Sequence, residues 1–206
     1  MLLPPLYPII DAGVLKVRGV GLADFARELR DAGVTLLQYR DKNGSPQEVL
    51  TAAAILSSVF AATQARLIMN DRADLARLAG WSGVHVGHLD LSPHDAKHAV
   101  GSGVIGVSTH NEEQVIAADA SEADYIAVGP VFGTSTKLDT EPVIGVEGVR
   151  QARALTRKPL VAIGGITLQN ARSVIDAGAD SVAVISAIFT TGQTPGQVVR
   201  DFFDHL

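Results

Sequence analysis

Two cations and an amide alternate along one short segment of the sequence, QYRDK at residues 38–42. In an extended strand the side chains alternate between two faces, so one face carries Gln38, Arg40 and Lys42. The other face carries Tyr39 and Asp41. Long polar side chains on a buried strand are costly unless they meet a ligand or one another. The cations suggest a phosphate or carboxylate ligand, the alternative being a strand end that emerges into solvent and pairs with acidic neighbours.

Two carboxylates follow successive apolar segments further along the chain. Asp71 ends the segment ARLIMND, and Asp90 comes just after GVHVG. If the two segments are adjacent parallel strands, both carboxylates lie at the same edge of the sheet. A small number of hard oxygen ligands suits Mg²⁺, which keeps several waters and takes other ligands from phosphates. The alternatives are an acid–base pair, or an N-cap role for Asp71 in the next helix.

A loop rich in hydroxyl groups follows another apolar segment, in AVGPVFGTSTK at residues 127–137. It ends in Thr134, Ser135, Thr136 and Lys137. A phosphate-binding P-loop needs four residues between its glycines and a lysine directly after the second one. Gly129 and Gly133 are separated by three residues, and the lysine comes last, so the P-loop interpretation fails. An anion cradle and an ordinary polar loop both remain open.

Glycine and small residues end the last two apolar segments, in AIGGI and VIS. Glycine lets backbone amides approach an anion, and the start of a following helix favours negative charge. Gly165, Ile185 and Ser186, with Gly164, are therefore candidates for a phosphate site made by backbone amides. Close packing between strand and helix is the alternative.

The histidines give a weaker signal. His94 and His98 share one face of an expected helix without an evident third ligand, which indicates a surface position. His85 lies within an expected strand and His110 ends one, and neither position requires a role in a site.

Short apolar segments alternate with amphipathic ones along the whole chain, which predicts alternating strands and helices. The expected strands span 6–11, 35–41, 65–71, 83–87, 104–110, 125–129, 159–165 and 181–186. The expected helices span 22–33, 46–63, 72–79, 92–100, 112–121, 146–155, 168–178 and 195–206. Strict alternation implies parallel strands with right-handed crossovers.

Eight such units in 206 residues predict an α/β fold, a (β/α)8 TIM barrel forming a single domain over residues 1–206. A doubly wound open sheet is the alternative, but the glycine fingerprint expected after its first strand is absent from IIDAGVLKVRG. In such barrels function gathers where the strands end at their carboxyl termini. The candidate residues above occupy those positions.

Composition limits the classes of function. The formal charge of −5 argues against broad nucleic-acid binding but allows cations to gather in one cleft. The chain has no cysteine, which excludes disulfides and thiolate chemistry. It also shows neither a membrane-length apolar run nor a signal peptide pattern, so we expect a cytoplasmic protein that does not associate with membranes.

Over essentially its whole length the chain resembles the thiamine phosphate synthase family. The resemblance rests on QYRDK, MNDRADLA, GVHVGHLDL, IGVSTHN, ADYIAVGPVFGTSTK, AIGGI and GADSVAVISAIF, which occur in the family's order and spacing. It implies a transferase of thiamine biosynthesis that joins a hydroxymethylpyrimidine diphosphate to a thiazole phosphate and releases pyrophosphate. Mg²⁺ and cationic residues would stabilise the leaving diphosphate, and the thiazole nitrogen would capture a pyrimidine carbocation.

The resemblance also implies a role for each matching residue. Binding of the pyrimidine diphosphate would fall to Gln38, Tyr39, Arg40, Asp41, Lys42, Asn70, Ser108 and Lys137, of which Arg40, Lys42, Ser108 and Lys137 would be catalytic. The thiazole phosphate would be held by Thr134, Ser135, Thr136, Gly165, Ile185 and Ser186. One Mg²⁺ would be bound by Asp71 and Asp90.

The sequence departs from the family pattern at two places. Ser135 replaces a usual proline, and His88 and Leu89 stand where Gln and Glu are commoner. Three alternatives share the phosphate site: a thiazole tautomerase, a sugar-phosphate isomerase or epimerase, and a non-catalytic sensor of thiamine precursors. Retention of Asn70, Asp71, Asp90 and Lys137 favours the synthase. The expected partners are small phosphorylated substrates, and assembly into a homo-oligomer is left open.

Overall fold

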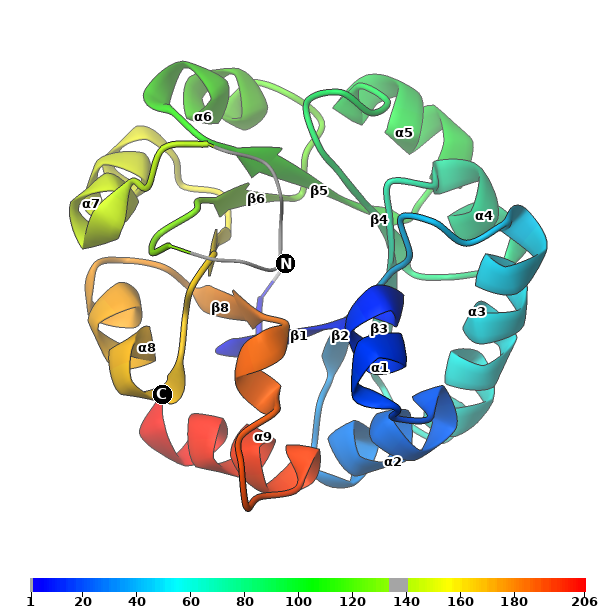
Figure 1. The fold of residues 1–206 in the computed structure, drawn as a ribbon. Helices are drawn as coiled ribbons and strands as arrows, with labels where there is room; N and C mark the ends of the chain where they lie inside the picture. The colour runs from blue at the N-terminus through cyan, green and yellow to red at the C-terminus, as the bar shows by residue number, and fades with distance from the viewer. Residues whose placement is uncertain (1, 134–140) are drawn as a thin grey trace.

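The computed structural model describes residues 2–133 and 141–206 and shows a closed barrel of eight parallel strands. Figure 1 shows the strands at the centre and the helices around them. The strands are β1 (Leu6–Asp11), β2 (Leu36–Arg40), β3 (Arg66–Asn70), β4 (Gly83–Val86), β5 (Val104–Thr109), β6 (Tyr125–Val128), β7 (Leu160–Ile163) and β8 (Ser181–Val184). Each strand pairs with its neighbour in sequence, and β8 pairs with β1. The predicted (β/α)8 barrel is confirmed.

The outer ring consists mainly of the predicted helices. They are α2 (Leu22–Asp31), α3 (Pro46–Phe60), α4 (Ala73–Leu78), α5 (Pro93–Val100), α6 (Glu112–Asp119), α7 (Gly145–Leu155), α8 (Leu168–Asp176) and α9 (Pro195–His205). Within the described residues, no helix has the length and apolar character needed to cross a membrane.

One helix was not predicted. α1 (Ala12–Arg18) follows β1 directly, where Asp11 accepts a hydrogen bond from the Val14 amide at 3.0 Å. It ends at Gly19, whose φ of 64° only glycine adopts at little cost. Seven residues are too few to show a helical period, so the hydrophobic pattern could not reveal this helix.

Alternation along the strands divides the core into two layers. One layer lies between the strands and the helices and includes Leu37, Tyr39 and Met69. The other fills the inside of the barrel and includes Ile68 and Tyr125. A side chain's position in this alternation therefore decides whether it can reach a site inside the barrel.

The last two strands are shorter than predicted. β7 ends at Ile163 because Gly164 and Gly165 take φ values of 99° and 63°, outside the range of a strand. A Cβ on Gly164 would lie 2.6 Å from the Pro130 Cβ, so only glycine fits there. After β8, Ser186 begins a single 3₁₀ turn, η1 (Ser186–Ile188), where the prediction had continued the strand.

Candidate active site

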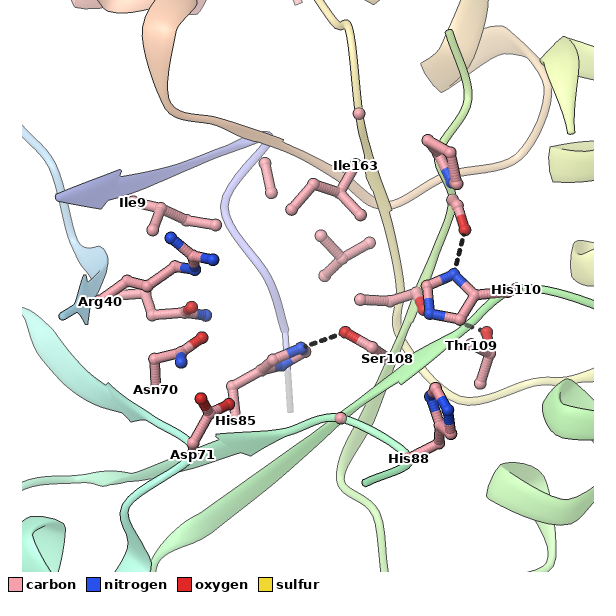
Figure 2. A pocket seen from close by; sticks show the side chains of 18 of the residues that line it. Ile9, Arg40, Asn70, Asp71, His85, His88, Ser108, Thr109, His110 and Ile163 are labelled. Carbon is pink, nitrogen blue, oxygen red and sulfur yellow. Dashed lines mark hydrogen bonds between the residues drawn. The ribbon is translucent and has the colours of Figure 1, made fainter. Parts of the chain in front are cut away.

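A cavity of about 450 Å³ opens at the carboxyl ends of the strands (Figure 2). It contains most of the polar candidates chosen from the sequence, namely Gln38, Arg40, Lys42, Asn70, Asp71, Asp90 and Ser108. Its floor is apolar and includes Ile9, Val161 and Ala183 from the interior layer. Charged groups therefore lie at the mouth of a cavity whose floor is largely apolar.

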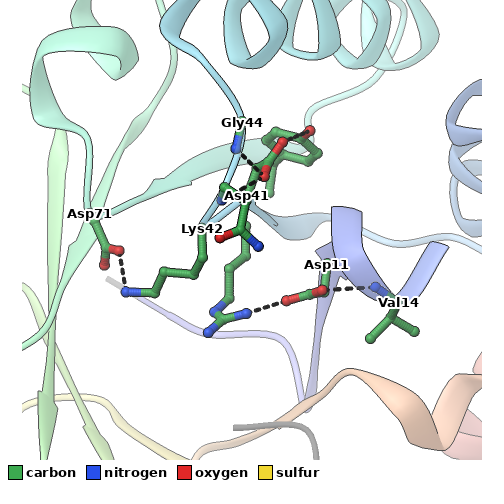
Figure 3. Close-up of polar contacts among 9 residues, drawn as sticks. Asp11, Val14, Asp41, Lys42, Gly44 and Asp71 are labelled. Atoms are coloured by element: carbon green, nitrogen blue, oxygen red, sulfur yellow. Dashed lines mark hydrogen bonds and ion pairs between the residues drawn. The ribbon is translucent and has the colours of Figure 1, made fainter. Parts of the chain in front are cut away.

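The two cations at the end of β2 and just after it, Arg40 and Lys42, are both paired with carboxylates (Figure 3). Arg40 Nη1 donates to Asp11 Oδ2, and Asp11 lies opposite Arg40 in the β1–β2 register. Lys42 Nζ donates to Asp71 Oδ2 at 2.6 Å. The sequence left open either a ligand or acidic partners for these cations. The structure supplies acidic partners that themselves lie at the ends of β1 and β3.

Tyr39 and Asp41, predicted among the substrate-binding residues, point away from the cavity and their side chains do not line it. Their part in substrate binding stays a prediction. Tyr39 packs in the layer between strands and helices, and its hydroxyl donates to Asp41 at 3.4 Å. Asp41 accepts hydrogen bonds from the Asn43 and Gly44 amides and so shapes the turn before α3. Strand alternation explains both positions.

Replacing Tyr39 by Phe is therefore expected to leave the kinetic constants of the enzyme within about twofold of wild type. The substitution removes a long hydrogen bond to Asp41 and costs less than about 1 kcal/mol of unfolding free energy. Steady-state kinetics and urea unfolding measure the two effects. A large rise in KM for either substrate would contradict this placement of Tyr39.

Asp71 has an unusual backbone conformation. Its φ is 61°, the only positive φ of a non-glycine residue in the described part of the chain. The turn is closed by the Arg72 amide, which donates to the Asn70 carbonyl at 2.7 Å, while the Asp71 amide donates to the His85 carbonyl at 2.7 Å. Such strained residues persist where the surroundings enforce them, and they concentrate at functional sites. The N-cap alternative for Asp71 is wrong, because the N-cap position of α4 is Arg72.

The Asp71 and Asp90 carboxyl groups interact with each other. Burial raises the pKa of Asp71 above its ordinary value, the Lys42 ammonium opposes the rise, and the Asp90 carboxylate adds to it. Asp90 also accepts a hydrogen bond from the Gly87 amide at 2.8 Å, which holds it at the cavity mouth. Two carboxylates that repel each other beside an open cavity form a suitable donor set for a divalent cation.

The described residues contain no cluster of three or more His, Cys, Asp or Glu that could hold a metal by itself. Mg²⁺ does not require one, since it is commonly bound by one or two carboxylates together with substrate phosphates and water. The residues present therefore fit Mg²⁺ better than a metal such as zinc, which needs three or four protein ligands.

The loops after β6 and β7 are held against each other. The Val131 and Phe132 amides donate to the Ile163 and Gly164 carbonyls, each at 2.9 Å. A Cβ on Gly165 would lie 2.5 Å from the Gly133 carbonyl oxygen, so this close approach requires glycine. The predicted Thr134, Ser135, Thr136 and Lys137 lie outside the described residues.

Of the remaining phosphate candidates, only Gly164 is among the described residues that line the cavity. Gly165 faces the loop after β6. Ile185 packs against the interior layer and Ser186 begins the turn after β8. Both therefore follow the strand end as predicted, but the backbone around Ser186 is helical and not extended.

Three histidines line the cavity, although the sequence gave them little weight: His85, His88 and His110. His85 bonds to the Ser108 hydroxyl through Nε2 at 2.9 Å, and His110 Nδ1 donates to the Gly129 carbonyl at 2.5 Å (Figure 2). His85 could have been found from alternation in GVHV, because Val84 and Val86 point to the outer layer. His94 is surface-exposed, as expected, and its Nδ1 lies 2.8 Å from Glu122 Oε2.

Comparison with known proteins assigns the chain to a family. The family model described as thiamine monophosphate synthase matches residues 6–188. The chain belongs to this family. A thiamine-phosphate synthase from Koribacter versatilis is 52% identical over 99% of this chain and 96% of its own. Another from Chloroflexus aurantiacus is 39% identical over 89% of this chain and 84% of its own.

Solved structures agree with membership of the thiamine monophosphate synthase family. The thiamine phosphate pyrophosphorylase from Pyrococcus furiosus superposes with a TM-score of 0.86 at 30% identity, over 98% of this chain and 95% of the other. The α-subunit of tryptophan synthase from the same organism has a TM-score of 0.70 at 14% identity, which shows a shared fold alone. The family resemblance inferred from the motifs is confirmed, and with it an enzyme of the transferase class with a role in thiamine phosphate synthesis.

Proposed function

We propose that this enzyme joins 4-amino-2-methyl-5-hydroxymethylpyrimidine diphosphate to a hydroxyethylthiazole phosphate, giving thiamine phosphate and pyrophosphate. One observation carries the proposal: a single cavity combines two cations, Arg40 and Lys42, with a repelling pair of carboxylates, Asp71 and Asp90. Cations can bind a diphosphate directly, and the carboxylates can bind it through a divalent metal ion.

The cavity divides into a charged mouth and a buried base. In our proposal the diphosphate lies at the mouth, near Arg40 and Lys42, and Lys137 contributes a further charge. The pyrimidine ring lies deeper, where Gln38, Asn70 and Ser108 offer hydrogen bonds above an apolar floor. The thiazole phosphate is held by Thr134, Ser135, Thr136, Gly165, Ile185 and Ser186, on the side of β6 to β8.

Mg²⁺ is the proposed metal, one ion for each active site, with Asp71 and Asp90 as its protein ligands. When bound, it would neutralise charge on the diphosphate and so favour the departure of pyrophosphate. Lys42 now pairs with Asp71 at 2.6 Å, and its ammonium can turn from that carboxylate to a phosphate oxygen. In this proposal Lys42 pairs with Asp71 in the free enzyme and with a phosphate oxygen when the diphosphate is bound.

The protein residues act by charge stabilisation and positioning. The C–O bond to the diphosphate breaks with its electron pair leaving on oxygen, and Arg40 and Lys42 stabilise the leaving group. The aminopyrimidine delocalises the positive charge that remains on its methylene carbon, and the thiazole nitrogen forms the new C–N bond. Catalysis then depends on holding the two substrates in line, and no protein nucleophile is needed.

The direct test mixes the purified enzyme with both substrates and Mg²⁺ and follows thiamine phosphate and pyrophosphate, which should form in equal amounts. Omission of Mg²⁺ or addition of EDTA should stop turnover. A folded enzyme that forms no product with both substrates present would refute the proposal. Isomerisation of the thiazole substrate without coupling would favour the tautomerase.

A further inference from the structure

A series of hydrogen bonds crosses the inside of the barrel along the base of the cavity and joins five strands. Gln38 Nε2 donates to the Tyr7 hydroxyl at 3.1 Å, and the Tyr7 and Tyr125 hydroxyls lie 3.0 Å apart. The Tyr125 hydroxyl lies 2.9 Å from His85 Nδ1, and His85 Nε2 lies 2.9 Å from Ser108 Oγ. Figure 2 shows the last of these bonds at the edge of the cavity.

Because the two tyrosine hydroxyls are buried, the direction of each hydrogen bond can be worked out from the number of hydrogens available. Tyr7 is 1% exposed and Tyr125 is 0% exposed, so neither hydroxyl can exchange its partner for bulk water. Burial also raises the pKa of both tyrosines above the ordinary value, so each keeps its hydrogen. Each hydroxyl therefore has one hydrogen to donate and must place it on a neighbour in the series.

The count begins at Gln38, whose amide nitrogen can only donate. The Tyr7 oxygen accepts that hydrogen, so the Tyr7 hydrogen goes to the oxygen of Tyr125, its other side-chain partner among the described residues. The Tyr125 hydrogen then goes to Nδ1 of His85, which must be unprotonated there. The hydrogen of neutral His85 is on Nε2 and is donated to Ser108 Oγ.

We propose that every donor in this series points the same way, from Gln38 towards Ser108, and that the series fixes His85 as the neutral Nε2–H tautomer. His85 is then a positioning residue. Because it donates to Ser108 Oγ, the Ser108 hydroxyl is free to donate its own hydrogen into the cavity. Ser108 thus presents a donor. At the other end Gln38 uses its NH₂ group on Tyr7 and presents its carbonyl as an acceptor. The two residues line the same cavity.

This pair of ends fits an aminopyrimidine, and here the inference rests on the proposed function. An aminopyrimidine carries an amino donor directly beside a ring-nitrogen acceptor. A fixed acceptor at Gln38 and a fixed donor at Ser108 complement that edge, whereas a freely rotating serine would serve either kind of partner. The hydrogen-bond series from Gln38 to Ser108 therefore contributes to selectivity for the aminopyrimidine ring, separately from the charged residues that bind the diphosphate.

The strand register and a glycine make room for the hydrogen-bond series. His85 lies opposite Gly106 in the β4–β5 register, and Gly106 lies opposite Tyr125 in the β5–β6 register. A Cβ on Gly106 would lie 2.0 Å from Tyr125 Cζ and 2.5 Å from His85 Nδ1. Only glycine between the two rings lets them meet across the intervening strand.

Nitrogen-15 NMR of the histidine rings tests the tautomer without any substrate. Near neutral pH the His85 ring should be neutral, with its hydrogen on Nε2. Its signals are assigned by their absence in His85→Gln, or by their selective shift in Ser108→Ala if the first variant does not fold. A hydrogen on Nδ1 would overturn the proposal, because it would mean that the Gln38 amide is reversed and every bond runs the other way. A doubly protonated ring would overturn it as well.

Kinetics of Tyr125→Phe tests the consequence for binding. Without the Tyr125 hydroxyl, Nδ1 loses its donor and the tautomer is no longer fixed, so KM for the pyrimidine diphosphate should rise roughly tenfold. KM for the thiazole phosphate should stay unchanged, and Tyr39→Phe, a buried tyrosine outside the cavity, is the matched control. A rise in KM confined to the pyrimidine diphosphate supports the proposed hydrogen-bond series. A general loss of structure would change KM for both substrates. Equal changes in both KM values, or no change in either, would overturn the proposal. If wild type shows the Nε2–H tautomer but no coupling activity, the proposed function fails and the hydrogen-bond order stands.

Discussion

Asp71→Asn is expected to lower kcat by at least about a hundredfold while the barrel stays folded. The substitution removes one of two carboxylates that can bind Mg²⁺ and weakens the stabilisation of a leaving diphosphate, where comparable electrostatic contributions amount to a factor of ~10²–10³. Asparagine is a suitable replacement because it tolerates the positive φ of 61° that most residues would strain to adopt.

Folding should be affected little by this change. The pair with Lys42 is lost, but the Lys42 side chain is 49% exposed, so the pair adds at most about 1 kcal/mol of stability. Burial raises the pKa of Asp71 and the Asp90 carboxylate adds to the rise, so a neutral side chain at position 71 relieves both unfavourable effects. Urea unfolding and circular dichroism should therefore resemble wild type.

Asp74→Asn is the matched control, since it removes a carboxylate three residues away that pairs with Arg72 at the surface. Kinetics at several Mg²⁺ concentrations should show a higher Mg²⁺ requirement for Asp71→Asn and wild-type behaviour for Asp74→Asn. Binding of Mn²⁺, followed by electron paramagnetic resonance, gives a measurement independent of turnover. Wild-type turnover in Asp71→Asn, or equal losses in the two variants, would refute the metal assignment.

Arg40→Met should both destabilise the barrel and abolish most activity. The Arg40 and Asp11 side chains are 13% and 8% exposed, and removal of the guanidinium leaves a buried carboxylate without its cation. Breaking a buried pair in this way costs roughly 3 kcal/mol of unfolding free energy. Activity should fall at least about a hundredfold, because a cation facing the diphosphate is lost.

The double variant Asp11→Asn/Arg40→Met separates the two effects. Asparagine removes the unpaired charge and can still accept the hydrogen bond from the Val14 amide that begins α1. Unfolding free energy should recover most of the loss while kcat/KM for the pyrimidine diphosphate stays low. Recovery of both would show that Arg40 acts through folding alone, and no stability loss in Arg40→Met would contradict the buried pair.

The candidate site was predictable where the argument needed only local alternation. The period of two in QYRDK correctly directed Gln38, Arg40 and Lys42 to the cavity, and it also indicated that Tyr39 and Asp41 point elsewhere. Including those last two residues in the site followed the family motif against the alternation. In the structure the side chains do alternate, with Gln38 and Arg40 in the cavity and Tyr39 in the layer between strands and helices.

Other parts of the site depended on contacts between distant segments. Asp11 ends the first expected strand, but the sequence gave it no role; only the β1–β2 register sets it beside Arg40. His85 looked like an isolated histidine in a strand, and its partners Tyr125 and Ser108 are 40 and 23 residues away. No local pattern reports a contact of that kind.

The sequence by itself determined the barrel, its family, and the end at which the polar residues gather. Those features follow from hydrophobic period and motif order, which are properties of neighbouring residues. Only the tertiary structure decided which side chains meet: Lys42 with Asp71, Arg40 with Asp11, and the series of hydrogen bonds that ends at Ser108. Closure of the barrel fixes the register between strands, and register decides which inward side chains come within hydrogen-bond distance.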